Sequence, residues 1–302
     1  MLWDGRPEGI FRSSKWDTDI RGVLLPDIHI PVHDWRKLDM VYECISDHRL
    51  DFGVQFGDLF DFDALGRWSK DKPGKVEGER MIQDFSLATD FWDSFSQALR
   101  NKNPEAQIYA LEGNHEARVQ KFCDEVPYFK GIFHLPNLLE FYARKIQWIP
   151  SFSESQMLRL DWKNNAIYSR VLGRTDWVAG TGVAFIHGWY CGMHHAKKTS
   201  DSYGRAMPII YGHTHDVQVY TSHAFGWPRP FSASIGHLRL ADAEYIAGAD
   251  RWHPAFAFIS LAAESEGIWD IQIIRICEDV FGNSHFFGPN GRRYTSRKIY
   301  GT

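Results

Sequence analysis

Short apolar runs, each followed at once by polar residues, recur along the first two thirds of the chain. They lie at residues 23–25, 52–56, 108–111, 183–186 and 209–211. Short apolar runs bounded by glycine and polar residues are typical of buried β-strands. An aspartate, asparagine or histidine follows each run within three residues. Because ligands of open α/β sheets gather beyond the carboxyl ends of the strands, we expect these polar side chains to meet at one sheet edge.

Helical periodicity lies between these runs. Asp34 has the position of an N-cap before apolar residues at 38, 41, 42 and 45. A longer apolar stripe at 81, 85, 88, 92, 95 and 99 predicts a core-facing amphipathic helix. Residues 117–147 are expected to be helical, with breaks at Pro127 and Pro136. Residues 151–180 are expected to be a polar connection that carries a hairpin.

A β pattern returns after residue 216. Apolar segments at 217–221, 231–235, 256–261 and 268–276 predict strands that complete a second sheet. The tail from Gly282 is rich in glycine, asparagine and basic residues, and it is expected to be solvated. Since no repeat, low-complexity segment or linker divides the chain, we expect one domain over residues 1–302. Its motifs lie within 21–216, and the second-sheet strands and the tail occupy 217–302.

Composition narrows the class of protein without naming a function. The chain has 302 residues, 44% hydrophobic and 24% charged, as in an ordinary globular protein. A net charge of −4 gives no general attraction to nucleic acid, but it does not exclude a local basic patch. The N-terminus lacks a signal-peptide pattern and no run is long enough to span a bilayer, so we expect a cytoplasmic protein without a membrane partner. The four cysteines are widely spaced, which predicts free thiols. Cys191 follows His187 by four residues and could lie near the metals, but a buried structural thiol is the favoured reading.

The polar residues after the runs form ordered motifs. The motifs are Asp27-Ile28-His29, Gly57-Asp58, Gly113-Asn114-His115-Glu116, His187-Gly188 and Gly212-His213-Thr214-His215. Mixed oxygen and nitrogen donors suit Mn, Fe, Zn or Ni and argue against Ca or an iron–sulfur cluster. Seven donors are too many for one tetrahedral zinc, but they suit two divalent ions that share one carboxylate. The seven candidate ligands are Asp27, His29, Asp58, Asn114, His187, His213 and His215.

At these motifs the chain resembles the calcineurin-like metallophosphoesterase superfamily. The resemblance covers roughly residues 21–216, and each single motif is weak while the ordered set is specific. It implies an α/β fold, a four-layer α-β-β-α sandwich of two mixed sheets. It also implies two divalent transition-metal ions, with Mn favoured, that clamp a phosphate ester and acidify a shared water.

The resemblance also implies a role for each motif residue. One metal would be held by Asp27, His29 and His215, the other by Asn114, His187 and His213, and Asp58 would bridge both. His115 would protonate the leaving oxygen, because an imidazole near neutral pKa suits proton transfer. Asp61 would orient His115, with Asp63 as the substitute if the turn differs, and a surface or helix-capping carboxylate is the alternative reading of Asp61.

One departure from the family bears on the substrate. The protein-phosphatase branch has an arginine directly after the aspartate that corresponds to Asp61, whereas this chain has Phe62. Arg67 or Arg118 could reach a phosphate, but neither matches the branch motif, and His33 could line the pocket mouth. The absence of the branch arginine at Phe62 favours phosphodiester substrates.

The expected function is therefore a metal-dependent phosphodiesterase. Its substrates would be nucleotides, cyclic nucleotides or similar small diesters. Three alternatives stay open: a DNA or RNA nuclease of the related branch, a phosphomonoesterase, and a binding protein with an inactive site. Specificity is expected to lie in the insertions at 59–106 and 151–180, where sequence alone does not define it.

Overall fold

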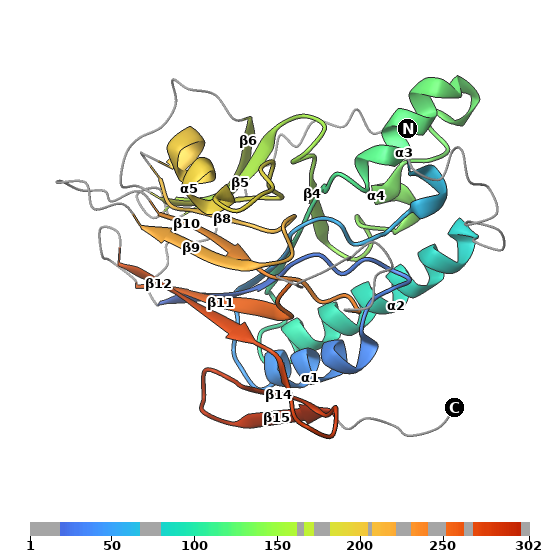
Figure 1. The fold of residues 1–302 in the computed structure, drawn as a ribbon. Coiled ribbons are helices and arrows are strands. Elements are labelled where there is room, and N and C mark those ends of the chain that lie inside the picture. Colours follow the sequence, from blue (N-terminus) through green and yellow to red (C-terminus); the bar gives the residue numbers. More distant parts are fainter. Residues whose placement is uncertain are drawn as a thin grey trace.

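The computed structural model describes residues 19–66, 80–161, 166–171, 182–204, 207–221, 231–240, 252–262 and 268–296 (Figure 1). The helices are α1 (Trp35–Ser46), α2 (Met81–Arg100), α3 (Ala117–Glu125), α4 (Leu135–Leu138) and α5 (His195–Thr199). The first strands are β1 (Ile20–Leu25), β2 (Phe52–Gln55), β3 (Gln107–Leu111), β4 (Ile146–Ile149), β5 (Gln156–Asp161), β6 (Ala166–Val171), β7 (Gly182–Ile186) and β8 (Ile209–Tyr211). The later strands are β9 (Val217–Thr221), β10 (Phe231–Ile235), β11 (Ala255–Leu261), β12 (Trp269–Arg275), β13 (Cys277–Glu278), β14 (Ser284–Phe287) and β15 (Arg293–Ser296).

Two six-stranded mixed sheets form the centre of the fold. The first has the order β12-β11-β1-β2-β3-β4, with β1 to β4 parallel and β11 antiparallel to β1. The second has the order β6-β5-β7-β8-β10-β9, with β7, β8 and β10 parallel. The hairpin expected between 151 and 180 is the antiparallel pair β5–β6. The predicted pair of mixed sheets is therefore confirmed.

Three buried apolar clusters separate four layers. Along β1, Val23 and Leu25 pack with helices α1 and α2, whereas Leu24 packs between the two sheets. Along β7, Phe185 belongs to the cluster between the sheets, and Ile186 packs on the outer side near α5. Because successive strand residues point to opposite faces, each sheet separates two cores. Figure 1 shows α1 and α2 on one side of the paired sheets and α5 on the other.

The first helix begins where its sequence predicts. The Asp34 side chain accepts the backbone N–H of Lys37, and Leu38, Val41 and Ile45 face the core. This N-cap satisfies a donor that the first turn of a helix leaves free. The apolar stripe of α2 is likewise buried, with Trp92 and Phe95 fully enclosed.

Three expectations need correction. β11 and β12 belong to the first sheet, not the second, because β11 covers the open edge of β1 in the register Ile20↔Leu261. The segment 117–147 is only partly helical, since its end forms β4 beside β3. The tail is not simply solvated: β13, β14 and β15 form a third sheet that contacts α1.

The small third sheet is fixed to α1 by buried rings and polar contacts. Phe286 and Tyr294 are stacked and buried, with ring centroids 5.0 Å apart. The Tyr294 hydroxyl donates to Asp47 Oδ2 at 2.7 Å, and Arg292 pairs with Glu43 and Asp47. Residues 297–302, also part of the expected solvated tail, lie outside the described residues.

A pair of neighbouring phenylalanines tests this docking. Phe286→Ala should lower the free energy of unfolding by roughly 3–5 kcal/mol, because it removes a buried ring. Phe287→Ala should change it by less than about 1 kcal/mol, because that ring is 64% exposed. Urea denaturation followed by circular dichroism measures both. Equal small effects would show that the tail does not pack on α1.

Candidate metal centre

The strand ends bring the sequence motifs together as expected. Asp27 and His29 follow β1, Asp58 follows β2 and Asn114 follows β3, all in the first sheet. The second sheet contributes His187 after β7, and His213 and His215 after β8. The carboxyl ends of parallel strands share one edge, so residues from distant parts of the chain converge there.

The backbone at this edge is unusual. Five of the seven expected ligands have a positive φ, between 32° and 71°; they are Asp27, His29, Asp58, His213 and His215. Such conformations cost of order 1–3 kcal/mol each for residues with a side chain, and they cluster at functional sites. Hydrogen bonds hold them: the Asp58 carbonyl accepts the N–H groups of Ile28 and His29 at 3.0 and 2.9 Å.

Two glycines allow the loops to approach closely. A Cβ on Gly113 would lie 2.2 Å from Asp58 Oδ1, and one on Gly212 would lie 2.4 Å from Asp27 Oδ2. Any larger residue would therefore displace a carboxylate at the centre of the site.

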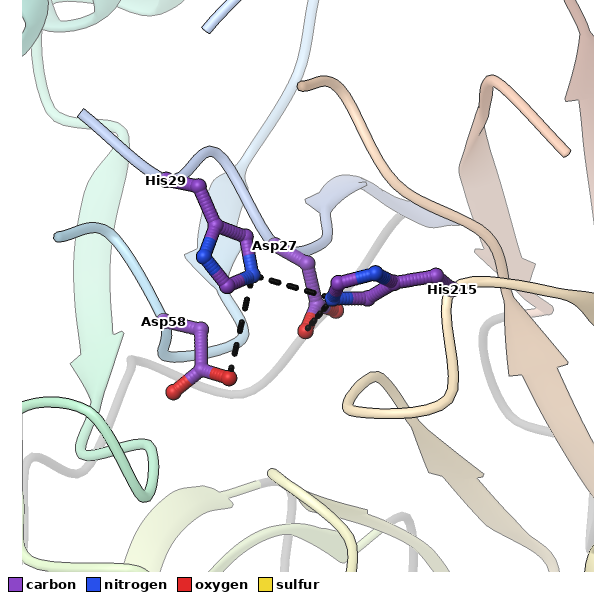
Figure 2. Close-up of side chains that lie close together, drawn as sticks. All are labelled: Asp27, His29, Asp58 and His215. Carbon is purple, nitrogen blue, oxygen red and sulfur yellow. Dashed lines mark hydrogen bonds and ion pairs between the residues drawn. The ribbon is translucent and has the colours of Figure 1, made fainter. Parts of the chain in front are cut away.

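The first cluster of donors contains Asp27, His29, Asp58 and His215 (Figure 2). The Nε2 atoms of His29 and His215 are 2.9 Å apart. His215 Nε2 lies 3.5 Å from Asp27 Oδ1, and His29 Nε2 lies 3.9 Å from Asp58 Oδ2. All four side chains are buried. Their donor atoms point at one another across a small space, as ligands of one ion would.

The second cluster contains Asp58, His187 and His213. His187 Nε2 lies 3.4 Å from Asp58 Oδ2 and 3.0 Å from the side-chain oxygen of Asn114. The His187 and His213 rings are 5.0 Å apart. Asp58 therefore belongs to both clusters, the position that a bridging carboxylate requires.

The hydrogen bonds of the imidazoles fit metal binding. Nδ1–H of His29 donates to Asp61 Oδ1 at 2.8 Å, and Nδ1–H of His187 donates to the Phe56 carbonyl at 2.8 Å. In the neutral form of each ring this leaves a bare Nε2 that faces the cluster, the arrangement typical of ligating histidines. The Nδ1 atoms of His213 and His215 are buried and have no hydrogen-bond partner among the described residues. The donor set thus fits two divalent ions.

Charges interact strongly inside this buried site. Burial would raise the pKa of Asp58, but His187 and His115 bring it well below its usual value. Burial would lower the pKa of His187, but Asp58 raises it to about 9. Burial and the neighbouring His187 lower the pKa of His213 to about 3. Without a cation, one proton is therefore held between Asp58 and His187.

Glu116 ties two ligand-bearing loops together. Its buried carboxylate accepts the N–H groups of Asp58 and Gly113, both at 2.8 Å, and of Phe60 at 3.0 Å. A return bond runs from the His115 N–H to Asp58 Oδ1 at 2.9 Å. Burial and the nearby Asp58 charge raise the pKa of Glu116 to about 7. Glu116 belongs to the Gly113-Asn114-His115-Glu116 motif, but the sequence alone indicated no role for it.

The surroundings of His115 differ from expectation. Its Nδ1–H donates to the backbone carbonyl of Asp61 at 2.6 Å, whereas the Asp61 carboxylate lies 3.5 Å away and bonds His29 instead. Arg118 donates to His115 Nε2 at 3.1 Å and to the Asp61 carbonyl at 2.8 Å. Burial lowers the pKa of His115. His115 Nε2 lies 3.9 Å from Asp58 Oδ2, at the margin of the two clusters that share Asp58, and His115 forms a third donor cluster with His29 and Asp61.

A segment that the sequence did not indicate also reaches the site. His237 is buried, and its ring lies 5.5 Å from the His215 ring. The centroids of the Trp252 and His215 rings are 4.3 Å apart. The Arg239 guanidinium lies over the Trp252 ring, 5.2 Å from its centroid. Arg239 Nη1 is also 3.9 Å from Asp61 Oδ1. The signal was present, because Gly-His follows β10 just as it follows β8.

Two further expectations concern the margin of the site. Cys191 is exposed, not buried, and its Sγ lies 3.0 Å from His213 Nε2. His33 pairs through its backbone with Arg239, and the donor clusters found among the described residues do not include it. Arg67 lies outside the described residues.

No described helix is long and apolar enough to cross a membrane.

Comparisons with known proteins give distant similarities. No protein-family model matches the chain. The gene 54 protein of Mycobacterium phage L5 is 26% identical over 261 residues, covering 80% of this chain and 89% of that protein. The gene 54 protein of phage D29 is 26% identical over 256 residues with the same coverage.

The similar solved structures are more distant in sequence. Vps29 of Chaetomium thermophilum has a TM-score of 0.41 and 10% identity, covering 93% of this chain and 98% of that one. The nuclease MPE of Pseudomonas putida has a TM-score of 0.33 and 12% identity, covering 91% of this chain and 86% of that one.

The proton at His187 gives a test of metal binding. Since the pKa of His187 is raised to about 9, the ring is protonated at pH 7.5 and must lose its proton to bind a cation. We expect binding of Mn²⁺ to release about one proton at this site, and His187→Gln to abolish that release. The release in the native protein should fall as the pH is raised toward 9, where about half of the rings are already deprotonated. Titration calorimetry in buffers of different ionisation enthalpy measures it; an unchanged release in His187→Gln would contradict the assignment.

Proposed function

We propose that the protein is a dinuclear metal-dependent phosphoesterase of the calcineurin-like metallophosphoesterase superfamily, acting on phosphodiesters. The observation that supports this most directly is the position of Asp58, whose carboxylate belongs to two of the three donor clusters found among the described residues. Two divalent ions bound there would supply Lewis acidity toward a phosphoryl group and acidify a water molecule. The mixed oxygen and nitrogen donors suit Mn, Fe, Zn or Ni, and Mn²⁺ is the ion that the resemblance to the superfamily favours.

The protein's own residues would position the ester and its leaving group. His29 is fixed by Asp61, and His187 by the Phe56 carbonyl, so each imidazole keeps one orientation. His115 stands at the margin of both clusters, where a leaving oxygen could reach its Nε2. A proton on this nitrogen would require Arg118 to turn its N–H elsewhere, and a phosphate oxygen is a suitable acceptor. Because the pKa of His115 is lowered, a smaller fraction of the molecules carries the protonated ring, but that ring is a stronger acid.

The preference for diesters rests on how the nearby arginines are placed. Phe62, where a phosphatase would have arginine, is buried and stacks on Phe60 with centroids 4.2 Å apart. Arg118 already donates to the Asp61 carbonyl and to His115. A dianionic monoester needs more cationic contacts than a monoanionic diester, so the diester suits this site better.

A substrate screen tests the function and the ester class together. Protein stripped with chelator and reloaded with Mn²⁺ should hydrolyse bis-p-nitrophenyl phosphate with a higher kcat/KM than phosphoserine peptides. Asp58→Asn should abolish turnover and reduce bound metal, because an amide cannot bridge two cations as a carboxylate does. Asp270→Asn, an exposed site on β12, should change neither. Near-normal activity of Asp58→Asn with two metals bound would refute the proposal, and higher kcat/KM on phosphopeptides would overturn the diester preference.

Leaving-group dependence tests the role of His115. His115→Ala should retain both metals and lose roughly 10²–10⁴-fold in kcat, the usual range for positioned proton transfer. The loss should be small for esters that release p-nitrophenolate, which needs no proton, and large for dinucleotides that release a ribose hydroxyl. Metal analysis by mass spectrometry accompanies the kinetics. An equal loss for both leaving groups would make His115 a residue that orients the phosphate.

A further inference from the structure

A stacked aromatic pair lies beside the second donor cluster. The rings of Phe152 and Trp189 are nearly parallel, 17° apart, with centroids separated by 4.5 Å. The Phe152 centroid lies 6.3 Å from the centroid of His187. Both rings are partly exposed, whereas the rings of the cores are enclosed. Trp189 packs on the outer core cluster with Ile186, so Phe152 rests on an anchored ring.

The backbone on both sides of Phe152 is fixed by the loops that carry the candidate ligands. The Ser151 hydroxyl accepts the backbone N–H of His187 at 3.2 Å. The Ser153 N–H donates to Glu112 Oε2 at 2.6 Å, and Glu112 directly precedes Gly113. The ring is thus held in place between the β7 and β3 loops. A rigid, partly exposed aromatic residue at this position adds little to the core, and it costs little entropy when a ligand stacks on it.

We infer that Phe152, supported by Trp189, is the stacking platform for a nucleobase of the substrate. This inference rests on the proposed function, since the phosphoryl group would occupy the adjacent donor clusters. In a nucleotide one sugar separates base and phosphate, so a base could lie on Phe152 while its phosphate reaches His187. Stacking accepts any base, because every base presents a π-face. The substrate class is therefore a nucleotide ester, in place of a simple alkyl or sugar ester.

Two pairs of small ligands isolate the base. AMP and ribose 5-phosphate share their phosphate and ribose and differ only in the base. Thymidine 5′-p-nitrophenyl phosphate and methyl p-nitrophenyl phosphate share the leaving group and differ in the nucleoside. Calorimetry on the Mn²⁺-loaded protein gives Kd for the first pair, and hydrolysis gives kcat and KM for the second. We expect the member with a base to bind about 5- to 100-fold more tightly, the range for stacking of one base.

Substitutions at Phe152 then separate stacking from packing. Phe152→Leu keeps an apolar contact with Trp189 but removes the ring, so it should weaken AMP binding and leave ribose 5-phosphate binding unchanged. It should raise KM for the thymidine ester with little change in kcat. Phe152→Tyr should restore the preference. Phe281→Leu, an exposed phenylalanine before β14, is the matched control and should have no effect. Equal losses for both ligands in Phe152→Leu, or no loss for either, would overturn the platform.

Two further outcomes are distinguishable in the same experiment. A single-stranded oligodeoxyadenylate that competes with AMP, and loses affinity in Phe152→Leu, would identify nucleic acid as the source of the base; no competition would identify free nucleotides. Hydrolysis of the methyl ester without any preference for the thymidine ester would overturn the platform while leaving the phosphoesterase function intact. Failure to hydrolyse either ester would refute the phosphoesterase function, and base-dependent AMP binding would then show that the platform exists without it.

Discussion

The structure of this edge depends on a single buried charge, the carboxylate of Asp58. Its backbone carbonyl accepts two N–H groups from the β1 loop, its N–H is held by Glu116, and its Oδ1 accepts the N–H of His115. A charge this deeply buried is stable only when it is paired and hydrogen-bonded. The protonated imidazole of His187, 3.4 Å from Oδ2, and the N–H of His115 meet that requirement. The loops after β1, β2 and β3 are therefore joined at Asp58, and its backbone hydrogen bonds offset part of the cost of the left-handed backbone at Asp58 and His29.

The sequence predicted the arrangement of the candidate ligands because strand ends obey a simple rule. Every apolar run became a strand. Parallel pairing placed the residues after β1, β2 and β3 at one edge of the first sheet and those after β7 and β8 at one edge of the second. The N-cap at Asp34 and the stripe of α2 followed from local patterns in the same way. These features depend only on residues that are close along the chain or on one rule of sheet topology, so they can be predicted from the periodicity of the sequence.

Features that depend on distant pairing were missed. Nothing in the apolar pattern of β11 distinguishes the open edge of β1 from the edge of the second sheet, and the small third sheet is too short to show periodicity. Side-chain partners were equally inaccessible: the family resemblance assigned Asp61 to His115, whereas the Asp61 carboxylate bonds His29 at 2.8 Å and lies 3.5 Å from His115 Nδ1. The exposure of Cys191 depends on a loop whose course no local pattern specifies, whereas the approach of His237 follows the Gly-His pattern that β10 shares with β8.

The pairing of β1 with β11 has a consequence for how the molecule reaches this state. Ile20 lies opposite Leu261, so the central strand of the first sheet obtains one of its two neighbours from the far end of the chain. Contacts of such high sequence separation slow folding, because the chain must close a long loop before the strand contacts stabilise it. During synthesis on the ribosome, this edge of β1 would stay uncovered until residues 255–261 had emerged. The last candidate ligand, His215, precedes β11, so all seven candidate ligands are synthesised before the first sheet obtains this neighbour.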